Sequence, residues 1–435
     1  MDRLKISIIG GGSVYAALML RSLALACRRG ALGPVDLALM DIAEERMTIM
    51  ARLGEQMASE AGADVDVTHT TELERALDGA HFVITTFRVG GLEGRLADET
   101  LPLEHHMLGQ ETVGAGGTFL ALRTVPAVLE VATKMERLCA DAWLVNYTNP
   151  ANFIVDAVRR RSNVKVVGLC DGVLGILRLL EKLLNIETSA FAGIDVRVAG
   201  VNHCTWTLAC AYNGRDLYPD VPRLIREVDP ARLTDREKLA VSMFDVLGIL
   251  PGSSAYTRYF WDLRTVLDEF TNPAFTPKAR RMMDHFEEAF RYFAEVEEGA
   301  LTLEKHVGDL EHGDQAVRFI EAVTADLREM QVVNVPNHGT VANLPDDAIV
   351  EVPGVVGRDG VTPVPVGAIP KCVIGKVRSQ LDHAELSVDA ALSGDPKLVV
   401  QAVLAHPDST TFGDVVETVK DLAAAHRAHL NHMRF

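Results

Sequence analysis

The sequence predicts an α/β fold: a Rossmann-type, doubly wound parallel sheet followed by an α+β region. In the first half of the chain, short apolar runs alternate with longer stretches of helical periodicity, the pattern of consecutive βαβ units. The first run ends in Gly10-Gly11-Gly12-Ser13 and leads directly into a helical stretch, as at the start of a Rossmann unit. A length of 435 residues exceeds the usual size of one core. We therefore expect a Rossmann-like domain over 1–195 and an α+β domain over 196–435.

The expected strands of the first domain are short, apolar and bounded by turn residues. Lys5–Ile9 ends in glycines and Val35–Met40 ends at Asp41, as buried parallel strands do. Val14–Arg28 lies between them and has the length of a helix. In order, the expected strands are 5–9, 35–40, 65–69, 82–86, 143–146 and 164–168, and the expected helices are 14–28, 43–61, 72–77 and 120–139.

The pattern changes in the second half, where long helical stretches predominate. Proline and glycine cluster between residues 352 and 370, which indicates irregular structure. Pro407 predicts a break in the last helical stretch. In order, we expect strand-like runs at 195–210 and 331–335, and helices at 235–247, 278–296, 314–330, 375–393 and 396–430.

The net charge and the cysteines limit the binding partners and the cellular compartment that we expect for this protein. The formal net charge is −17 with no basic arm, so the surface repels nucleic acid and anionic lipid. The longest Leu/Ala-rich stretch, residues 16–26, is broken by Arg21 and is too short to span a bilayer. The six cysteines are scattered without a CxxC pair, and no signal peptide precedes the first strand. We therefore expect reduced thiols in the cytoplasm.

The glycine turn has the features of a dinucleotide site. Gly10 permits the tight turn, and Gly12 lets the backbone approach a pyrophosphate held at the helix N-terminus. Asp41 ends the next strand, where a carboxylate accepts from a ribose 2′-hydroxyl, which favours NAD over NADP. Tyr15 stands where the usual fingerprint has its third glycine, so the helix must pack differently. The alternative is a glycine turn that binds no ligand.

Cys170 and His203 have the chemistry of a metal site. Cys170 follows an apolar strand at the edge where a parallel sheet places its ligands, and His203 follows the strand-like Val196–Val201. A thiolate and an imidazole suit a borderline divalent metal, with substrate oxygens completing its coordination. The structural alternative is a buried small hydrophobe and a hydrogen-bonded core histidine.

A series of short segments occurs in a fixed order through most of the chain. The segments are Gly10-Gly11-Gly12-Ser13, Phe87-Arg88-Val89-Gly90-Gly91, Arg95 with Asp98-Glu99, Gly109-Gln110-Glu111-Thr112, Asn146-Tyr147-Thr148-Asn149-Pro150-Ala151-Asn152, Gly168-Leu169-Cys170-Asp171, Asn202-His203-Cys204-Thr205-Trp206, Pro251 with Tyr256-Thr257-Arg258-Tyr259, and Asn337-His338-Gly339 with Asn343-Leu344-Pro345-Asp346-Asp347. This series resembles glycoside hydrolase family 4, the NAD- and divalent-metal-dependent glycosidases, and most resembles its 6-phospho-β-glucosidases. The resemblance implies a fold like that of the lactate/malate dehydrogenase superfamily.

The resemblance implies hydrolysis by oxidation, elimination and addition, and not displacement by two carboxylates. The sugar is oxidised at C3, a base removes the C2 proton, the aglycone leaves, water adds, and C3 is reduced again. NAD and Mn²⁺ (or another divalent metal) are the implied cofactors, and a homodimer or homotetramer is the implied assembly. The resemblance assigns Cys170 and His203 to the metal, Tyr256 as the base with Asp171 and Glu111 as further catalytic residues, Gly10, Gly12, Ser13, Asp41 and Arg88 to NAD, and Arg95, Asn149, Asn202 and Arg258 to the substrate.

Departures from the family pattern keep other functions open. Glu104, His105 and His106 stand where the family often has lysine, an aromatic residue and glycine, which weakens the case for a phosphorylated sugar; Arg280 and Arg281 are loose candidates for a phosphate contact. Asp171 stands where some α-acting members carry an acid, so a 6-phospho-α-glucosidase or α-galactosidase-like activity is an alternative. The others are an NAD-dependent 2-hydroxy-acid dehydrogenase and an inactive sugar- or NAD-binding relative.

Overall fold

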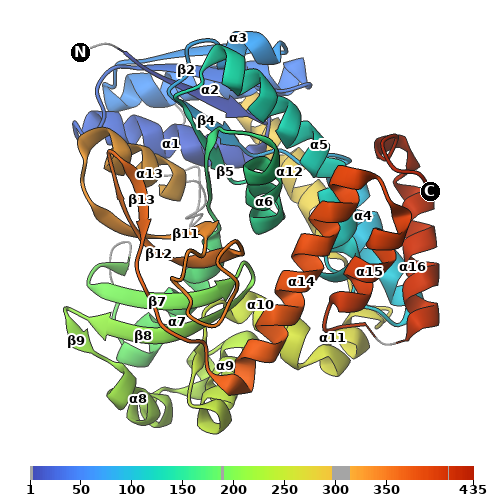
Figure 1. Cartoon of the computed structure of the whole chain (residues 1–435). Helices are drawn as coiled ribbons and strands as arrows, with labels where there is room; N and C mark the ends of the chain where they lie inside the picture. Colours follow the sequence, from blue (N-terminus) through green and yellow to red (C-terminus); the bar gives the residue numbers. More distant parts are fainter. Residues whose placement is uncertain (1–2, 188–190, 296–313, 410) are drawn as a thin grey trace.

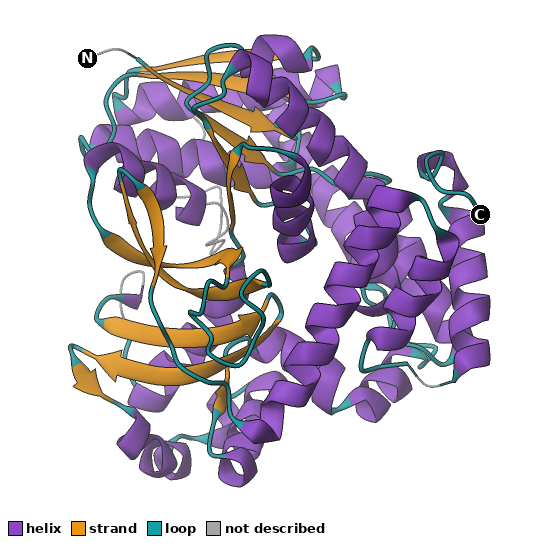
Figure 2. Cartoon of the chain, in the orientation of Figure 1, coloured by secondary structure: helices purple, strands orange, loops and turns teal. Residues whose placement is uncertain are grey.

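The computed structural model describes residues 3–187, 191–295, 314–409 and 411–435, which build helical layers around one mixed sheet (Figures 1 and 2). Within the described residues the sheet has 13 strands. Its first-half strands are all parallel and run in the order β3-β2-β1-β4-β5-β6, the order of a dinucleotide-binding Rossmann fold. The predicted fold class is therefore confirmed.

The first-half elements lie close to their predicted positions. The strands are β1 (Leu4–Ile9), β2 (Val35–Met40), β3 (Val65–Thr70), β4 (Phe82–Thr85), β5 (Trp143–Asn146) and β6 (Lys165–Gly168), and the helices are α1 (Val14–Arg28), α2 (Glu44–Ala61), α3 (Leu73–Leu77), α4 (Gly91–Thr100), α5 (Gly114–Leu138), α6 (Ala151–Arg161) and α7 (Leu174–Leu184). Helices α4, α6 and α7 were not among the predicted elements.

Alternate residues of the parallel strands pack against opposite helical layers. Ile6 and Ile8 of β1 join a core that includes α1, α2 and α13, whereas Ile9 joins a core with α3, α5 and α6. Ser7 is fully buried, and its hydroxyl donates to the Ala76 carbonyl at 2.6 Å. Burial on both faces is why these strands read as nearly continuous apolar runs.

The sheet continues into the second half of the chain. Strand β6 meets β11 at Gly168 and Asn334, and β12 meets β7 at Glu351 and Gly200, in both cases antiparallel. The predicted boundary at 195/196 falls inside β7, and the division into two domains stays a prediction. The second-half elements are β7 (Ile194–Val201), β8 (Cys204–Tyr212), β9 (Arg215–Asp216), α8 (Val221–Glu227), α9 (Asp235–Leu247), β10 (Leu250–Pro251), α10 (Ser254–Trp261), α11 (Leu263–Phe270), α12 (Lys278–Glu295), α13 (Asp314–Ala325), β11 (Glu329–Pro336), β12 (Ile349–Gly357), β13 (Gly360–Pro363), α14 (Lys371–Ser393), α15 (Pro396–Ala405) and α16 (Phe412–Ala425).

Two second-half expectations were wrong. Residues 352–370 are not irregular throughout, because β12 and β13 pair there; Gly354 permits this, since a Cβ on it would lie 2.6 Å from Val361 Cγ1. The helix expected over 314–330 ends at Ala325, where Asp326 and Arg328 take positive φ angles of 52° and 53°. The strand-like run 195–210 is confirmed, as a hairpin of β7 and β8 that turns at Asn202 and His203. The break predicted at Pro407 is confirmed, between α15 and α16.

Helix α5 is long and apolar enough to cross a membrane by length and composition alone. However, 78% of its most apolar stretch is buried inside the fold. Figure 1 shows α5 running diagonally toward the C-terminal helices, and α6, α14, α15 and α16 all contact it. It is therefore explained as a central core helix of the folded chain.

Candidate active site

A cavity of about 2470 Å³ opens at the carboxyl ends of the parallel strands, where doubly wound folds bind their ligands. Small-molecule sites usually occupy about 300–1,000 Å³, so this cavity has room for a dinucleotide and a sugar together. Every predicted site residue except Asn202 lines it: Gly10, Gly12, Ser13, Asp41, Arg88, Arg95, Glu111, Asn149, Cys170, Asp171, His203, Tyr256 and Arg258.

The glycine turn after β1 is shaped by close backbone contacts. Gly10 has a φ of 96°, and a Cβ on it would lie 2.5 Å from the Thr86 carbonyl oxygen, so only glycine fits. The Gly12 backbone nitrogen donates to Asp41 Oδ2 at 3.1 Å. Ser13 is the N-cap of α1 and accepts from the Tyr15 backbone nitrogen. The turn, the helix N-terminus and the strand-end carboxylate thus face one cavity, as a dinucleotide requires.

Tyr15 does not disturb the packing of α1 on the sheet. Its side chain lines the cavity and meets Phe286 of α12 edge-on, with ring centroids 5.6 Å apart. Ala16 and Ala17, both 0% exposed, provide the close approach of helix to sheet that the third glycine usually permits. With Tyr15 at the position of the usual third glycine, the small residue that packs on the sheet is therefore the next one along the helix, Ala16.

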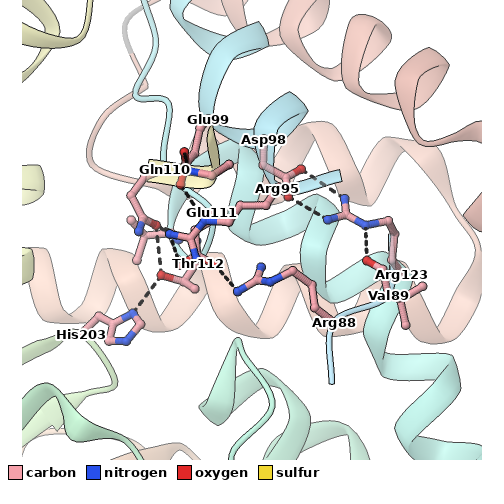
Figure 3. Close-up of polar contacts among 12 residues, drawn as sticks. Arg88, Val89, Arg95, Asp98, Glu99, Gln110, Glu111, Thr112, Arg123 and His203 are labelled. Carbon is pink, nitrogen blue, oxygen red and sulfur yellow. Dashed lines mark hydrogen bonds and ion pairs between the residues drawn. The ribbon is translucent and has the colours of Figure 1, made fainter. Parts of the chain in front are cut away.

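Glu111 lies at the centre of a buried charge network (Figure 3). Its carboxylate pairs with Arg88 Nη2 at 2.6 Å and with Arg95 Nη2 at 3.0 Å. Burial on its own raises the pKa of Glu111, but the charges of Arg88, Arg95 and Lys278 outweigh it and lower that pKa to about 2. Glu111 is thus an ionised carboxylate near neutral pH, able to hold cationic side chains beside the substrate.

Helix α4 is held in place from both sides. Arg95 Nε donates to Glu99 Oε1 at 2.7 Å, while Asp98 pairs with Arg123 of α5 at 2.7 and 3.1 Å. His426, at the end of α16, also contacts Asp98, at 2.8 Å. The neighbouring Asp98 therefore serves as an anchor between helices, and Arg95 turns to Glu111 in the cavity.

The predicted metal ligands lie side by side. Cys170 Sγ and His203 Nε2 are 3.4 Å apart, although 33 residues separate them in sequence. A thiolate sulfur and an imidazole nitrogen this close together are a donor pair that suits a borderline divalent metal. In the described chain no group of three Cys, His, Asp or Glu side chains could hold a metal. A metal here would need ligands from substrate or water.

Tyr256 lies directly on this pair. Its ring stacks on the His203 ring with centroids 3.5 Å apart and an interplanar angle of 7°. Burial, together with the nearby Glu111, raises the pKa of Tyr256 well above its usual value. Tyr256 is therefore a neutral phenol in the protein without ligands.

The remaining predicted residues have mixed surroundings. Asp171 Oδ1 accepts from the Tyr147 hydroxyl at 3.3 Å and from Gln315 Nε2 at 3.2 Å. Arg258 forms an ion pair with Glu269. Asn202, which does not line the cavity, donates to the buried Glu351 at 2.8 Å, so its role in substrate binding stays a prediction.

Sequence reasoning missed several cationic residues that line the cavity. Arg236 and Lys278 were missed, whereas Arg281, which also lines the cavity, was already a candidate for a phosphate contact. None of the three forms an ion pair with another described residue. Lys278 is the first residue of a helix that the sequence predicts, and its cavity position depends on how α12 packs on α4. Glu104, His105 and His106 do not line the cavity, so those departures do not change it.

Comparison with known proteins places the chain in a family. Residues 5–186 match the model described as family 4 glycosyl hydrolase, and residues 198–408 match the model of the family 4 glycosyl hydrolase C-terminal domain. A probable 6-phospho-β-glucosidase of Bacillus subtilis (strain 168) is 32% identical over 98% of this chain and 97% of its own length.

Solved structures agree. A 6-phospho-α-glucosidase from gut microorganisms, in complex with NAD and glucose-6-phosphate, has a TM-score of 0.89 and 26% identity over 100% of both chains. The 6-phospho-β-glucosidase of Thermotoga maritima with manganese, NAD⁺ and glucose-6-phosphate has a TM-score of 0.85 and 24% identity, covering 98% of this chain and 99% of its own. Cryptosporidium parvum malate dehydrogenase shares the fold, with a TM-score of 0.55 and 16% identity, covering 90% and 99%.

Proposed function

Because the chain belongs to the family 4 glycosyl hydrolases, we propose that it hydrolyses 6-phosphoglucosides with the help of NAD and a divalent metal, manganese first. The observation that carries this proposal is that one cavity joins three features: the glycine turn, the Cys170–His203 pair and Tyr256. The family membership argues against a 2-hydroxy-acid dehydrogenase. A measurement of turnover would distinguish an active glycosidase from an inactive sugar- or NAD-binding relative.

Both cofactors fit the residues present. Bound NAD would supply reversible oxidation of the sugar, and a bound divalent ion would supply Lewis-acid stabilisation of oxyanion charge. Gly10, Gly12 and Ser13 would hold the pyrophosphate, Arg88 would add a cation, and Asp41 would accept from the ribose. The soft Cys170 sulfur and the His203 nitrogen would hold the metal.

The chain's own groups then have distinct tasks. Tyr256 takes the C2 proton of the sugar; as a buried phenol it must first be activated by positive charge beside it. Asn149 and Arg95 orient the sugar hydroxyls, with Glu111 holding Arg95 in place. Asp171, which follows Cys170 in the sequence and lines the cavity, would protonate the leaving-group oxygen of an α-glycoside.

The cavity favours an anionic substrate. The molecule has a net charge of −17, yet Arg236, Lys278 and Arg281 line the cavity without ion-pair partners among the described residues. These side chains are suited to a sugar 6-phosphate. The β anomer is proposed first on the 32% identity to a probable 6-phospho-β-glucosidase, and Asp171 favours the α anomer as the second candidate.

The test is a panel of nitrophenyl α- and β-glucosides and galactosides, with and without 6-phosphate, assayed with NAD, Mn²⁺ and a reducing agent. We expect turnover of a 6-phosphoglucoside that needs both cofactors, with NAD in catalytic amounts. Cys170→Ser and His203→Ala should each abolish it, whereas Cys372→Ser, which changes an exposed thiol, should not. Stoichiometric NADH formation, or full activity of both ligand variants, would contradict the proposal.

The compartment and the assembly remain proposals. We propose a cytoplasmic enzyme, which agrees with six cysteines that are all free thiols. The homodimer or homotetramer implied by the family resemblance is checked by light scattering.

A further inference from the structure

The hydrogen bonds around Thr112 determine which ring nitrogen of His203 carries its proton. Gln110 Oε1 accepts from the backbone nitrogens of Thr112 at 2.6 Å and of Val113 at 2.9 Å. Two backbone N–H groups can point only at an acceptor, so this atom is the amide oxygen. The Gln110 side chain is therefore fixed in one orientation.

The Thr112 hydroxyl has only one hydrogen to donate. Its Oγ1 lies 3.0 Å from Gln110 Oε1, which has no hydrogen, so Thr112 must be the donor in that bond. Its second contact, 3.1 Å from His203 Nδ1, must then be one that it accepts. It follows that Nδ1 carries the hydrogen.

The other ring nitrogen is consequently a lone pair. A histidine that binds a metal does so as a neutral imidazole, which has one hydrogen only. With that hydrogen on Nδ1, the Nε2 lone pair points toward Cys170 Sγ, 3.4 Å away, and the Gly172 backbone nitrogen donates to the same sulfur. This is the tautomer that a metal on Nε2 requires.

The local fold brings together the three residues of this hydrogen-bonded chain, Gln110, Thr112 and His203, which we call the relay. The loop that carries Gln110 and Thr112 folds back over the first turn of α5, where a Cβ on Gly116 would lie 2.2 Å from the Gln110 carbonyl oxygen. On the opposite side, His203 occupies the hairpin turn with a φ of 69°, a conformation that histidine tolerates better than most residues. Figure 3 shows Thr112 between the Gln110 side chain and His203.

We propose that Gln110 and Thr112 are positioning residues that fix His203 in its Nδ1–H tautomer and thereby prepare Nε2 to bind the metal. This rests on the proposed function, since it presumes a metal at Cys170 and His203. Removing such a partner of a metal-binding histidine typically weakens metal affinity about 10- to 100-fold. Tyr256 also forms a hydrogen bond with Thr112, so loss of turnover alone would not distinguish the two roles.

The experiment therefore measures the tautomer and metal affinity directly. Nitrogen-15 NMR of metal-free protein labelled at histidine, assigned with His203→Gln, should show His203 protonated on Nδ1. Titration of Mn²⁺ with NAD present should show that Thr112→Val weakens binding about 10- to 100-fold, while Thr112→Ser restores it. The matched control is Thr124→Val, which removes a buried hydroxyl of α5 that has no hydrogen-bond partner among the described residues.

The outcomes separate this inference from the proposed function. An Nε2–H tautomer in the wild type, or unchanged Mn²⁺ affinity in Thr112→Val while Cys170→Ser loses Mn²⁺, would overturn the relay and leave the metal site standing. Failure of the wild type to bind Mn²⁺ would instead contradict the proposed function, and the relay with it. Equal weakening by Thr112→Ser and Thr112→Val would also overturn the relay, because the hydroxyl would not be responsible.

Discussion

Tyr256 tests the proposed chemistry with the smallest chemical change. Tyr256→Phe keeps the ring that stacks on His203 and removes only the hydroxyl that we propose takes the C2 proton. We expect kcat to fall about 100-fold or more, the usual effect of losing a general base. The control is Tyr218→Phe, which removes a phenol that is hydrogen-bonded outside the cavity. Unchanged turnover in Tyr256→Phe would exclude it as the base.

Glu111 links a single carboxylate to the pH dependence of stability. Its pKa is lowered to about 2 in the folded protein, against about 4.3 for a free glutamate. Its ionisation therefore stabilises the fold fully above about pH 4.3, and this contribution of about 3 kcal/mol is lost as the pH falls toward 2.

Glu111→Gln should consequently lose about 3 kcal/mol of unfolding free energy at pH 7, and about half of that at pH 3. Urea unfolding of the variant and the wild type at both pH values measures the difference. A loss that is the same at both values would show that Glu111 acts through packing and not through its charge.

The side chain of Asp98 anchors helix α4 to helices α5 and α16, and this packing can be tested through the stability of the fold. Asp98 joins α4 to α5 through Arg123 and to the end of α16 through His426, and both charged side chains of the Asp98–Arg123 pair are 0% exposed. Asp98→Ala leaves the Arg123 charge buried, so we expect a loss of about 3–5 kcal/mol in unfolding free energy. Glu227→Ala, which breaks an exposed pair with Arg223 on α8, should cost about 1 kcal/mol or less. Similar losses would contradict the anchoring role.

Elements with strong local patterns were predictable from the sequence, and elements defined by tertiary contact were not. The predicted bounds of α1, β2, β5 and α9 match the structure, because each is an apolar or amphipathic run with clear ends. Helix α5 begins at Gly114, six residues before its predicted start, because its first turn is rich in glycine. Those glycines are needed because the loop that carries Glu111 packs directly on them.

The candidate site was likewise predictable where a local sequence pattern marks it, and unpredictable where tertiary contacts build it. The glycine turn and Asp41 could be read from local pattern, but Cys170 and His203 gained meaning only through the family resemblance. His203 was expected to follow a strand-like run, but the left-handed turn that it occupies was not predicted. The cationic lining from α9 and α12 had no local signal, since Arg236 and Lys278 read as ordinary surface residues of helices.

The molecule as a whole is acidic, with a net charge of −17, but its cavity is lined by Arg236, Lys278 and Arg281, which have no ion-pair partner among the described residues. Lys278→Met should raise KM for a 6-phosphoglucoside about 10-fold, with a smaller change in kcat, because a charge-assisted contact in the bound state is lost. The unphosphorylated glycoside should be affected little. Lys238→Met, at an exposed lysine outside the cavity, is the control. Equal effects on both substrates would place Lys278 away from the phosphate.

The central claim is that the sugar is deprotonated at C2 during hydrolysis, and solvent isotope incorporation tests it most directly. The enzyme, with NAD and Mn²⁺, is allowed to hydrolyse its 6-phosphoglucoside in D₂O, and the released sugar is examined by NMR. Elimination with Tyr256 as the base predicts deuterium at C2, because the proton removed there exchanges with solvent before water adds. Complete hydrolysis with hydrogen retained at C2 would contradict elimination and point to direct displacement, with Glu111 and Asp171 as the carboxylates to examine.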